Sequence, residues 1–310
     1  MSKLKISIAI CTWNRADSLK ETLTRLVQLN IPKEVNLNVI VVNNNSTDHT
    51  DEVIESFKKL LPITHVFEKK PGVSNARNKA VEVASGDYIL WTDDDVLVDK
   101  NWLSVYTEYF LNNSDIDVFG GPILPYYEGS PPKWLVNGID AIRDAFALRN
   151  LSSYPIPFIP RSEALPFGAN FAIKLETQIK YLYSPKLGRQ PGNINLLGEE
   201  TLVINKILDS NKKGLWIPEA IVHHRVPLER QSIKYVSDYF IGKGESIGYV
   251  PTGSEKLLFG KPIWLLLQIM KLHFNFLYQR LFLGELYWLQ ALKQRNINIG
   301  LLKSIKNHES

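Results

Sequence analysis

The feature that most constrains the fold is an alternation of short apolar runs with segments of helical periodicity over the first 120 residues. Four short runs rich in apolar and β-branched residues lie at 6–11, 37–42, 63–67 and 88–91. Between them, apolar residues recur at helical spacing within 18–29, 46–61 and 74–84. This order predicts a parallel sheet with helices on both faces, whose ligands bind beyond the carboxyl ends of the strands.

Composition excludes several other classes of protein. The chain has 310 residues, 45% of them apolar and 22% charged, which is too much apolar side chain for a disordered protein. Its single cysteine, Cys11, excludes a disulfide framework and a multi-cysteine zinc site, and favours a cytoplasmic location. The first apolar run, 6–11, is too short for a signal peptide, and no uncharged apolar stretch of about 18 residues predicts a spanning helix.

Charge and texture divide the chain. Residues 251–310 carry eight Lys or Arg and three Asp or Glu, a net charge of +5, whereas residues 1–250 carry a net charge of −1. The main body is therefore not a nucleic-acid binder. We expect one domain over 1–250, with a nucleotide-binding half at 1–120 and an acceptor-binding, catalytic half at 121–250, and a helical extension at 251–310.

The second half of this domain begins with a stretch of different amino-acid composition. Residues 122–166 hold eight of the 17 prolines and predict a long irregular region, either a surface excursion or a flap that binds an acceptor. Regular structure is expected again at a strand at 167–173, a helix from Glu199 to about Leu208, strand pieces at 216–218 and 221–224, and a helix at 231–242.

Three adjacent carboxylates, Asp93, Asp94 and Asp95, follow the fourth apolar run directly. They repel one another, and a divalent cation relieves that repulsion, because Mg²⁺ and Mn²⁺ prefer oxygen ligands. If strand geometry persists, Asp93 and Asp95 point to one side. The alternative is a solvated acidic turn that caps the following segment.

Two further groups could carry chemistry. Arg77 falls in the first turn of the helix expected at 74–84, with Ser74 as its N-cap, and a cation there is disfavoured unless an anion lies nearby. Alternatively, Arg77 reaches a surface carboxylate. The Gly-rich phosphate signatures are absent. Late in the chain, Glu199 and Glu200 stand at an expected helix start, where glutamates are also ordinary dipole partners.

A histidine pair, His223 and His224, follows an apolar strand. Histidines at such a place serve as buried hydrogen-bonding groups, as metal ligands, or as both.

Together these segments resemble glycosyltransferase family 2, the inverting enzymes of GT-A fold, over roughly residues 5–245. The segments that carry the resemblance are 6–15, 41–48, 72–78, 86–95, 198–200 and 218–227. It implies an α/β fold, Rossmann-like, with a mixed, mainly parallel sheet and helices on both faces, followed by the helical C-terminal extension. It also implies a hexosyltransferase-type enzyme that moves a sugar from a nucleotide-sugar, expected to be a UDP-sugar, to an acceptor hydroxyl in polysaccharide or glycoconjugate biosynthesis.

The resemblance assigns roles to individual residues. It implies Glu200 as the catalytic base, with Glu199 as the second choice, and Glu200 stands where the family more often has aspartate. The residues implied to bind the nucleotide-sugar are Thr12, Arg15, Asn43, Asn45, Arg77, Asp93 and Asp94. The implied ligands of a divalent cation, Mn²⁺ or Mg²⁺, are Asp95, Asp93 and His224, with His223 weaker. Asn43 replaces an acidic residue that contacts uracil, although its amide oxygen can still accept from a base N–H.

Two other functions compete with this hypothesis. A nucleotide-sugar pyrophosphorylase has a Gly-rich loop after its first strand, but the loop at 12–16 contains no glycine. A catalytically silent nucleotide-sugar-binding scaffold at the membrane is the third alternative, and turnover of donor would separate it from an enzyme. Expected partners are the donor and a glycan, lipid-linked or other hydroxyl acceptor; the sequence does not determine the oligomeric state.

The tail from Pro262 to Gln294 is rich in Trp, Leu, Phe and Tyr. A narrow polar stripe, with an apolar surface around it, falls on Gln268, Lys271, Asn275 and Gln279. Gly284 interrupts the pattern, which predicts two helices. One alternative is an interfacial helix that places the chain peripherally on the cytoplasmic face of an anionic membrane; the other is a core helix packed on the domain or on a dimer partner.

Overall fold

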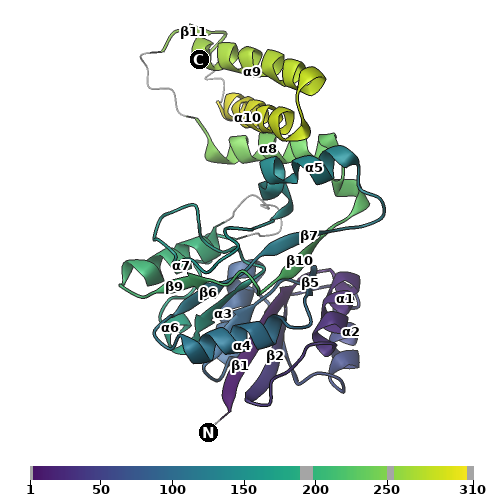
Figure 1. Ribbon diagram of the computed structural model, residues 1–310, viewed down its shortest axis with the longest axis vertical. Helices are drawn as coiled ribbons and strands as arrows, with labels where there is room; N and C mark the ends of the chain where they lie inside the picture. The colour runs from purple at the N-terminus through teal and green to yellow at the C-terminus, as the bar shows by residue number, and fades with distance from the viewer. Residues whose placement is uncertain (1–2, 189–197, 250–254, 306–310) are drawn as a thin grey trace. The chain divides into compact units, whose positions relative to one another are not determined.

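The computed structural model describes residues 3–188, 198–249 and 255–305, and it divides into two compact units (Figure 1). The first unit comprises residues 1–125 and 148–225, and the second comprises residues 126–147 and 226–310. The structure thus groups residues 126–147 and 226–250 with the C-terminal helices, whereas the sequence placed them with the sheet.

A seven-stranded mixed sheet forms the centre of the first unit, in the order β3-β2-β1-β4-β8-β6-β9. Its strands are β1 (Leu4–Thr12), β2 (Val35–Asn43), β3 (Ile63–Phe67), β4 (Tyr88–Trp91), β6 (Val118–Gly120), β8 (Phe171–Lys174) and β9 (Gly214–Trp216). The strands β3, β2, β1 and β4 run parallel, and β8 is antiparallel to both of its neighbours. The predicted mixed, mainly parallel sheet is confirmed.

Helices cover both faces of this sheet. The helices of the first unit are α1 (Ala16–Val27), α2 (Thr50–Phe57), α3 (Val73–Val83), α4 (Trp102–Asn112), α6 (Leu175–Gln178) and α7 (Glu199–Asp209). Residues of α3 and α7 share one core with Ile89 and Trp91 of β4. On the opposite face Phe110 of α4 stacks on Tyr88 with 3.8 Å between ring centroids. Alternate residues of β4 therefore pack into the cores on the two opposite faces of the sheet.

A second, three-stranded sheet of order β5-β10-β7 comprises β5 (Val96–Val98), β7 (Ile123–Tyr127) and β10 (Val222–Val226). Fully buried Asn170 ties this region together, because its amide oxygen accepts from Trp102 Nε1 and Tyr106 Oη, both at 2.9 Å. Its amide nitrogen donates to the carbonyls of Pro122 at 2.8 Å and Ala220 at 2.7 Å. All four hydrogen-bonding sites of the amide are used.

Three sequence expectations need correction. The stretch 122–166 is not uniformly irregular, because it contains β7, α5 (Lys133–Ile142) and the short 3₁₀ helix Arg143–Phe146. Ser74 is not an N-cap: α3 begins one residue before it, and its hydroxyl donates to the carbonyl of Leu187 at 2.7 Å. The pattern analysis did not identify α4, which is largely buried and therefore lacks a clear polar face.

The second unit is helical. It contains α5, the 3₁₀ helix Leu228–Arg230, α8 (Ile233–Ile247), the hairpin β11 (Leu257–Leu258) and β12 (Lys261–Pro262), α9 (Ile263–Phe282) and α10 (Glu285–Ser304). The central helix is α10, which packs against α5, α8 and α9. Gly244 of α8 and Gly300 of α10 lie so close that a side chain at either would collide with the backbone of the other helix.

The predicted break at Gly284 is confirmed, and the two tail helices differ in character. Seven residues of α10 are buried, so this helix belongs to the core of its own unit. By contrast, α9 buries only Leu265 and Phe276. Among the described residues no helix is both long and apolar enough to cross a bilayer.

Candidate functional site

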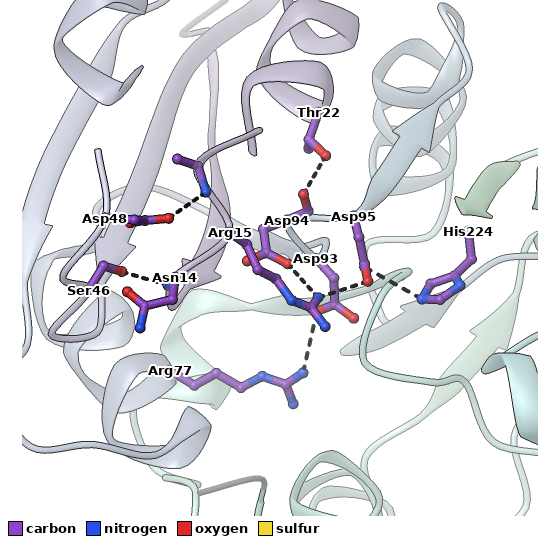
Figure 2. Close-up of polar contacts among 11 residues, drawn as sticks. Asn14, Arg15, Thr22, Ser46, Asp48, Arg77, Asp93, Asp94, Asp95 and His224 are labelled. Carbon is purple, nitrogen blue, oxygen red and sulfur yellow. Dashed lines mark hydrogen bonds and ion pairs between the residues drawn. The ribbon is translucent and has the colours of Figure 1, made fainter. Parts of the chain in front are cut away.

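The site lies where β1, β2 and β4 end, entirely within the first unit. Thr12 of β1 pairs in register with Asn43 of β2, and β4 runs parallel to β1 and ends just before the three aspartates. Because carboxyl ends of parallel strands meet at one edge, the expected clusters converge there. Figure 2 shows Arg15 and the aspartates pointing toward one another at this edge.

Arg15, the N-cap residue of α1, binds two of the aspartates through one nitrogen. Its Nη1 lies 3.0 Å from Asp94 Oδ1 and 2.8 Å from Asp95 Oδ2. Asp94 is buried, and this burial together with Asp95 raises the pKa of its carboxyl to about 7, although Arg15 opposes the shift. One partly exposed cation thus balances a crowded pair of carboxylates.

The aspartates do not continue the alternation of β4. This strand ends at Trp91 and β5 begins at Val96, so the carboxylates lie in the connecting turn. The strand geometry on which the expected alignment of Asp93 and Asp95 depended therefore does not extend to them, and the two make different contacts. Asp93 Oδ1 lies 4.0 Å from Arg77 Nη2, whereas Asp95 Oδ1 lies 3.5 Å from His224 Nε2 (Figure 2).

The loops after β1 and β2 brace each other. The backbone N–H of Asn14 donates to Ser46 Oγ at 2.9 Å, and Asn14 Oδ1 accepts from the backbone of Thr47 at 2.7 Å. Asp48 Oδ2 accepts from the backbone N–H of Ala16 at 3.0 Å, which satisfies a donor at the start of α1. The rim of the site is therefore held by cross-loop hydrogen bonds (Figure 2).

Asn43, expected at the nucleotide base, is buried and already engaged. Its Oδ1 accepts from the backbone N–H of Ser46 at 2.8 Å, and its Nδ2 donates to Asp51 Oδ1 at 2.6 Å. One lone pair of the amide oxygen is used to shape the turn. Asn45 is exposed in this turn with φ 63°, a left-handed conformation that asparagine tolerates.

Arg77 lies in a buried aromatic cage. Its guanidinium carbon lies 5.3 Å from the ring centroid of Tyr183, 5.8 Å from that of Trp91 and 5.9 Å from that of Phe171. Gly168 lies against its Nη2, where a Cβ would collide. Aromatic faces stabilise a cation that has left water, so this position is built for arginine.

The anions that Arg77 requires at the start of α3 are side chains of the protein itself. Its Nη1 lies 3.2 Å from Glu199 Oε1 and 3.7 Å from Glu200 Oε2. Burial works against the charge of Arg77, but these glutamates favour it, and the pKa lies above its usual value. With Asp93 at Nη2, one guanidinium touches both predicted acidic clusters. Glu199 is buried, so the nearest carboxylate partner of Arg77 is not a surface carboxylate.

Glu199 and Glu200 open α7, as expected, after Gly198 in a left-handed conformation with φ 92°. Glu200 belongs to a mostly buried carboxylate pair, and burial together with Glu199 raises the pKa of Glu200 to about 7, against the effect of Arg77. A carboxylate with a pKa near neutrality can accept a proton efficiently at physiological pH.

Adjacent histidines point to opposite faces of β10. His224 is buried, faces Asp95 with its Nε2, and has no hydrogen-bond partner at its Nδ1. His223 pairs with Leu97 of β5, and burial lowers the pKa of its ring. Within the described ranges, no three or more His, Cys, Asp or Glu side chains form a group that could hold a metal ion. The three expected ligands thus supply one close pair, Asp95 and His224.

Sequence reasoning missed the residues that hold the charged groups. Tyr183 and Phe171 complete the cage of Arg77, and Asp48 and Ser46 fix the loop before α1. The one local signal was Trp91, two positions before Asp93, because it ends the apolar strand β4 and shares a core with Ile89. Nothing near Tyr183 in the sequence marks it as a neighbour of Arg77.

Comparison with known proteins identifies relatives of this chain. A family model described as "Glycosyl transferase family 2" matches residues 7–167. The succinoglycan biosynthesis protein ExoM of Rhizobium meliloti is 26% identical over 250 residues, which is 79% of this chain and 74% of that protein. The glucosyl-dolichyl phosphate glucuronosyltransferase of Haloferax volcanii is 29% identical over 135 residues, which is 42% of each protein, so this chain spans less than half of its length.

Two solved structures share the fold. One is the mannosyltransferase PcManGT from Pyrobaculum calidifontis, solved with GDP-Man and Mn²⁺. Its TM-score is 0.58 at 15% sequence identity, and the match covers 100% of this chain and 89% of the PcManGT chain. Residues 1–349 of S. aureus TarS, solved with UDP, give a TM-score of 0.50 and 16% identity, covering 79% of this chain and 65% of that one. The family model spans more than half of the 310 residues, and the chain belongs to glycosyl transferase family 2.

Proposed function

We propose that this glycosyltransferase moves a sugar from a nucleoside diphosphate to an acceptor hydroxyl with inversion at the anomeric carbon, in polysaccharide or glycoconjugate biosynthesis. The observation that carries the proposal is the contact of Arg77 with both acidic clusters, Asp93 on one side and Glu199 and Glu200 on the other. A donor's leaving group and an acceptor's proton would then be handled in one site.

The nucleotide would occupy the edge formed by Thr12, Arg15 and Asn43, with Asp94 near the ribose. Arg15 supports this place, because its side chain is 36% exposed and can turn toward a diphosphate. Asn43 Oδ1 already accepts a hydrogen bond from Ser46, which weakens the case for a contact with uracil. A UDP-sugar is the first donor to test, and a GDP-sugar is the second. One neighbour in fold was solved with UDP and another with GDP-Man.

A divalent cation would be held by Asp95 and His224, with Asp93 at the edge. The residues fit such an ion, because a carboxylate oxygen and an imidazole nitrogen face each other: Asp95 Oδ1 and His224 Nε2 lie 3.5 Å apart. Mg²⁺ usually takes only one or two carboxylates from a protein and completes its shell with phosphate and water. A site with few protein ligands, such as Asp95 with His224, agrees with this preference. The cation supplies Lewis-acid stabilisation of the charge on the departing diphosphate.

Glu200 would accept the proton of the acceptor hydroxyl. Its raised pKa keeps it basic enough to take a proton and ionised in part at neutral pH. Inversion follows if the acceptor attacks from the side opposite the leaving group, as in inverting hydrolysis. Two relatives support a polymer product: one is a succinoglycan biosynthesis protein, and another is a poly(ribitol-phosphate) beta-glucosyltransferase.

The test is a panel of UDP- and GDP-sugars with Mn²⁺ or Mg²⁺, read first by the thermal shift of the protein and then by release of nucleoside diphosphate. We expect one donor to raise the melting temperature, because a ligand of the native state stabilises it. EDTA and Asp95→Asn should each weaken that binding by at least about tenfold. Full activity in EDTA would refute the metal role, and donor binding without turnover in the presence of acceptors would favour the silent scaffold.

A further inference from the structure

Most of the outward face of α9 is apolar. Leu265 and Phe276 are its buried residues and define the inner side. At 3.6 residues per turn, Leu267, Phe274 and Leu281 lie on the opposite side, and they are 58%, 65% and 76% exposed. The same face is widened by four exposed side chains, Met270, Leu277, Tyr278 and Phe282. An exposed apolar surface of this extent marks a place of interaction.

The polar stripe of α9 does not cover this face. The stripe runs along one flank of the helix: Gln268 and Asn275 are exposed there, Gln279 is half-buried, and Lys271 stands at the edge of the outward face. The helix therefore presents apolar side chains over most of its outward side, and its polar residues lie along one flank. A water-facing surface helix shows the reverse arrangement.

The hairpin that precedes α9 adds an apolar tip. Phe259 and Gly260 form its two-residue turn with φ 50° and 72°. A left-handed conformation is costly for a bulky residue, yet Phe259 is 91% exposed and gains nothing by packing here. Leu257 and Leu258 beside it are exposed as well. A strained, solvated phenylalanine at a loop tip is suited to insertion into an apolar medium.

Charge identifies the medium. No Asp or Glu occurs in α9, whereas Lys271 and Arg280 are exposed on it and Lys256 is exposed beside the hairpin. The described residues 255–305 hold seven Lys or Arg and two Glu. Two copies of this cationic surface would repel each other, while an anionic surface attracts it. Exposed Trp264, Tyr278 and Tyr287 are the residue types enriched at membrane interfaces.

We propose that the outward face of α9 and the tip of the β11–β12 hairpin dock on the surface of an anionic lipid bilayer. The helix would lie in the plane of the interface, with Phe259 inserted and the lysines among the head groups. This inference stands on the second unit alone and is independent of the donor, the metal and the base proposed above.

The test uses the full chain and sedimentation with vesicles of phosphatidylcholine, with or without phosphatidylglycerol. The face variant is Leu267→Gln/Phe274→Gln/Leu281→Gln, in which glutamine keeps helix propensity. Its matched control, Leu60→Gln/Leu111→Gln/Ile159→Gln, removes side chains of similar exposure, at 62%, 57% and 64%, from the first unit. Phe259→Gly removes the tip and relieves its backbone conformation.

We expect the face variant to weaken binding to anionic vesicles by at least about a hundredfold, and Phe259→Gly by about tenfold, because burial of each large apolar side chain contributes about a factor of ten or more. Lys271→Gln should cost about fivefold. The control triple should bind as the parent does. Equal binding of the face variant and the parent, or equal binding to neutral and anionic vesicles, would overturn the proposal.

A second copy of the chain is the competing occupant, and light scattering without lipid detects it. A dimer of the parent that the face variant converts to monomer would overturn the lipid proposal. A parent that is monomeric without lipid and binds anionic vesicles would support it. Donor hydrolysis, measured on the same variants without vesicles, should stay unchanged, so loss of vesicle binding is distinguishable from loss of the catalytic site.

Discussion

Two arginines of the first unit each form ion pairs with two adjacent carboxylates, but in different surroundings. Arg15 neutralises Asp94 and Asp95, and Arg77 neutralises Glu199 and Glu200. In each cluster burial raises the pKa of one carboxyl, that of Asp94 or of Glu200, to about 7. The side chain of Arg15, however, is 36% exposed and that of Arg77 only 5%.

This difference separates an exchangeable charge from a built-in one. Arg15 is the partly exposed member of its ion pairs, so a metal ion could replace it at Asp95, and its guanidinium could then turn toward a diphosphate. Arg77 is stacked among three rings and could leave only by exposing a buried carboxylate pair. This difference supports the proposed roles, in which the aspartate cluster binds the donor and its cation and the glutamate cluster holds the base.

The largest expected effect removes the base of the built-in cluster. Glu200→Gln keeps size and hydrogen bonding but cannot accept a proton, so the transfer rate should fall by about 10²–10⁴. Donor affinity, measured by calorimetry, should barely change. The matched control is Glu199→Gln. A dead Glu199→Gln enzyme beside an active Glu200→Gln enzyme would move the base to its neighbour.

A second effect tests whether Arg77 is structural. Arg77→Met fills much of the cage but leaves the glutamates unpaired, and the free energy of unfolding should fall by about 3–5 kcal/mol. Urea denaturation measures it. A double variant that also carries Glu199→Gln should recover part of the loss, because fewer buried charges remain. Unchanged stability of Arg77→Met would break the contrast between the two arginines.

The pH dependence of Glu200 gives a smaller effect with a defined sign. Its folded-state pKa, about 7, exceeds the ordinary value of 4.5, so the folded chain binds the proton more tightly than the unfolded chain does. Stability from this group is full below pH 4.5 and is lost as pH rises toward 7. Activity should rise over the same approach to neutrality as the base ionises. Thermal melts across this range should be flatter for Glu200→Gln, and equal slopes would contradict the assignment.

The smallest effect belongs to Arg15. Arg15→Gln should lower the free energy of unfolding by less than Arg77→Met does, since Arg15 is 36% exposed and water screens its ion pairs, whereas Arg77 is 5% exposed. Donor binding, in contrast, should weaken, because the cation that faces an entering diphosphate is gone. Urea denaturation and calorimetry measure the two. A loss of stability as large as that of Arg77→Met would show that both arginines are structural.

Local patterns predicted most of the sheet and the location of the charged groups. The strand at Ile63–Phe67 and the helix that begins at Glu199 are as the periodicity indicates, and the aspartates follow β4 as expected. Hydrophobic period and turn residues act within a few positions of each other, so a sequence displays them directly. The helix α4 was not predicted because it is largely buried and only weakly amphipathic, whereas α5 is amphipathic but lies in the proline-rich stretch that was assigned as irregular.

The sequence by itself determined the order of the elements, the acidic clusters at their ends and the division of the tail at Gly284. Only the tertiary structure decided which charge meets which. Arg15 and Asp95 are 80 residues apart, and Arg77 meets Glu199 across an even longer stretch of chain. It also decided that α9 turns its apolar face outward while α10 is buried. Such pairings depend on strand order and loop paths, which bring distant residues together and leave no mark in local periodicity.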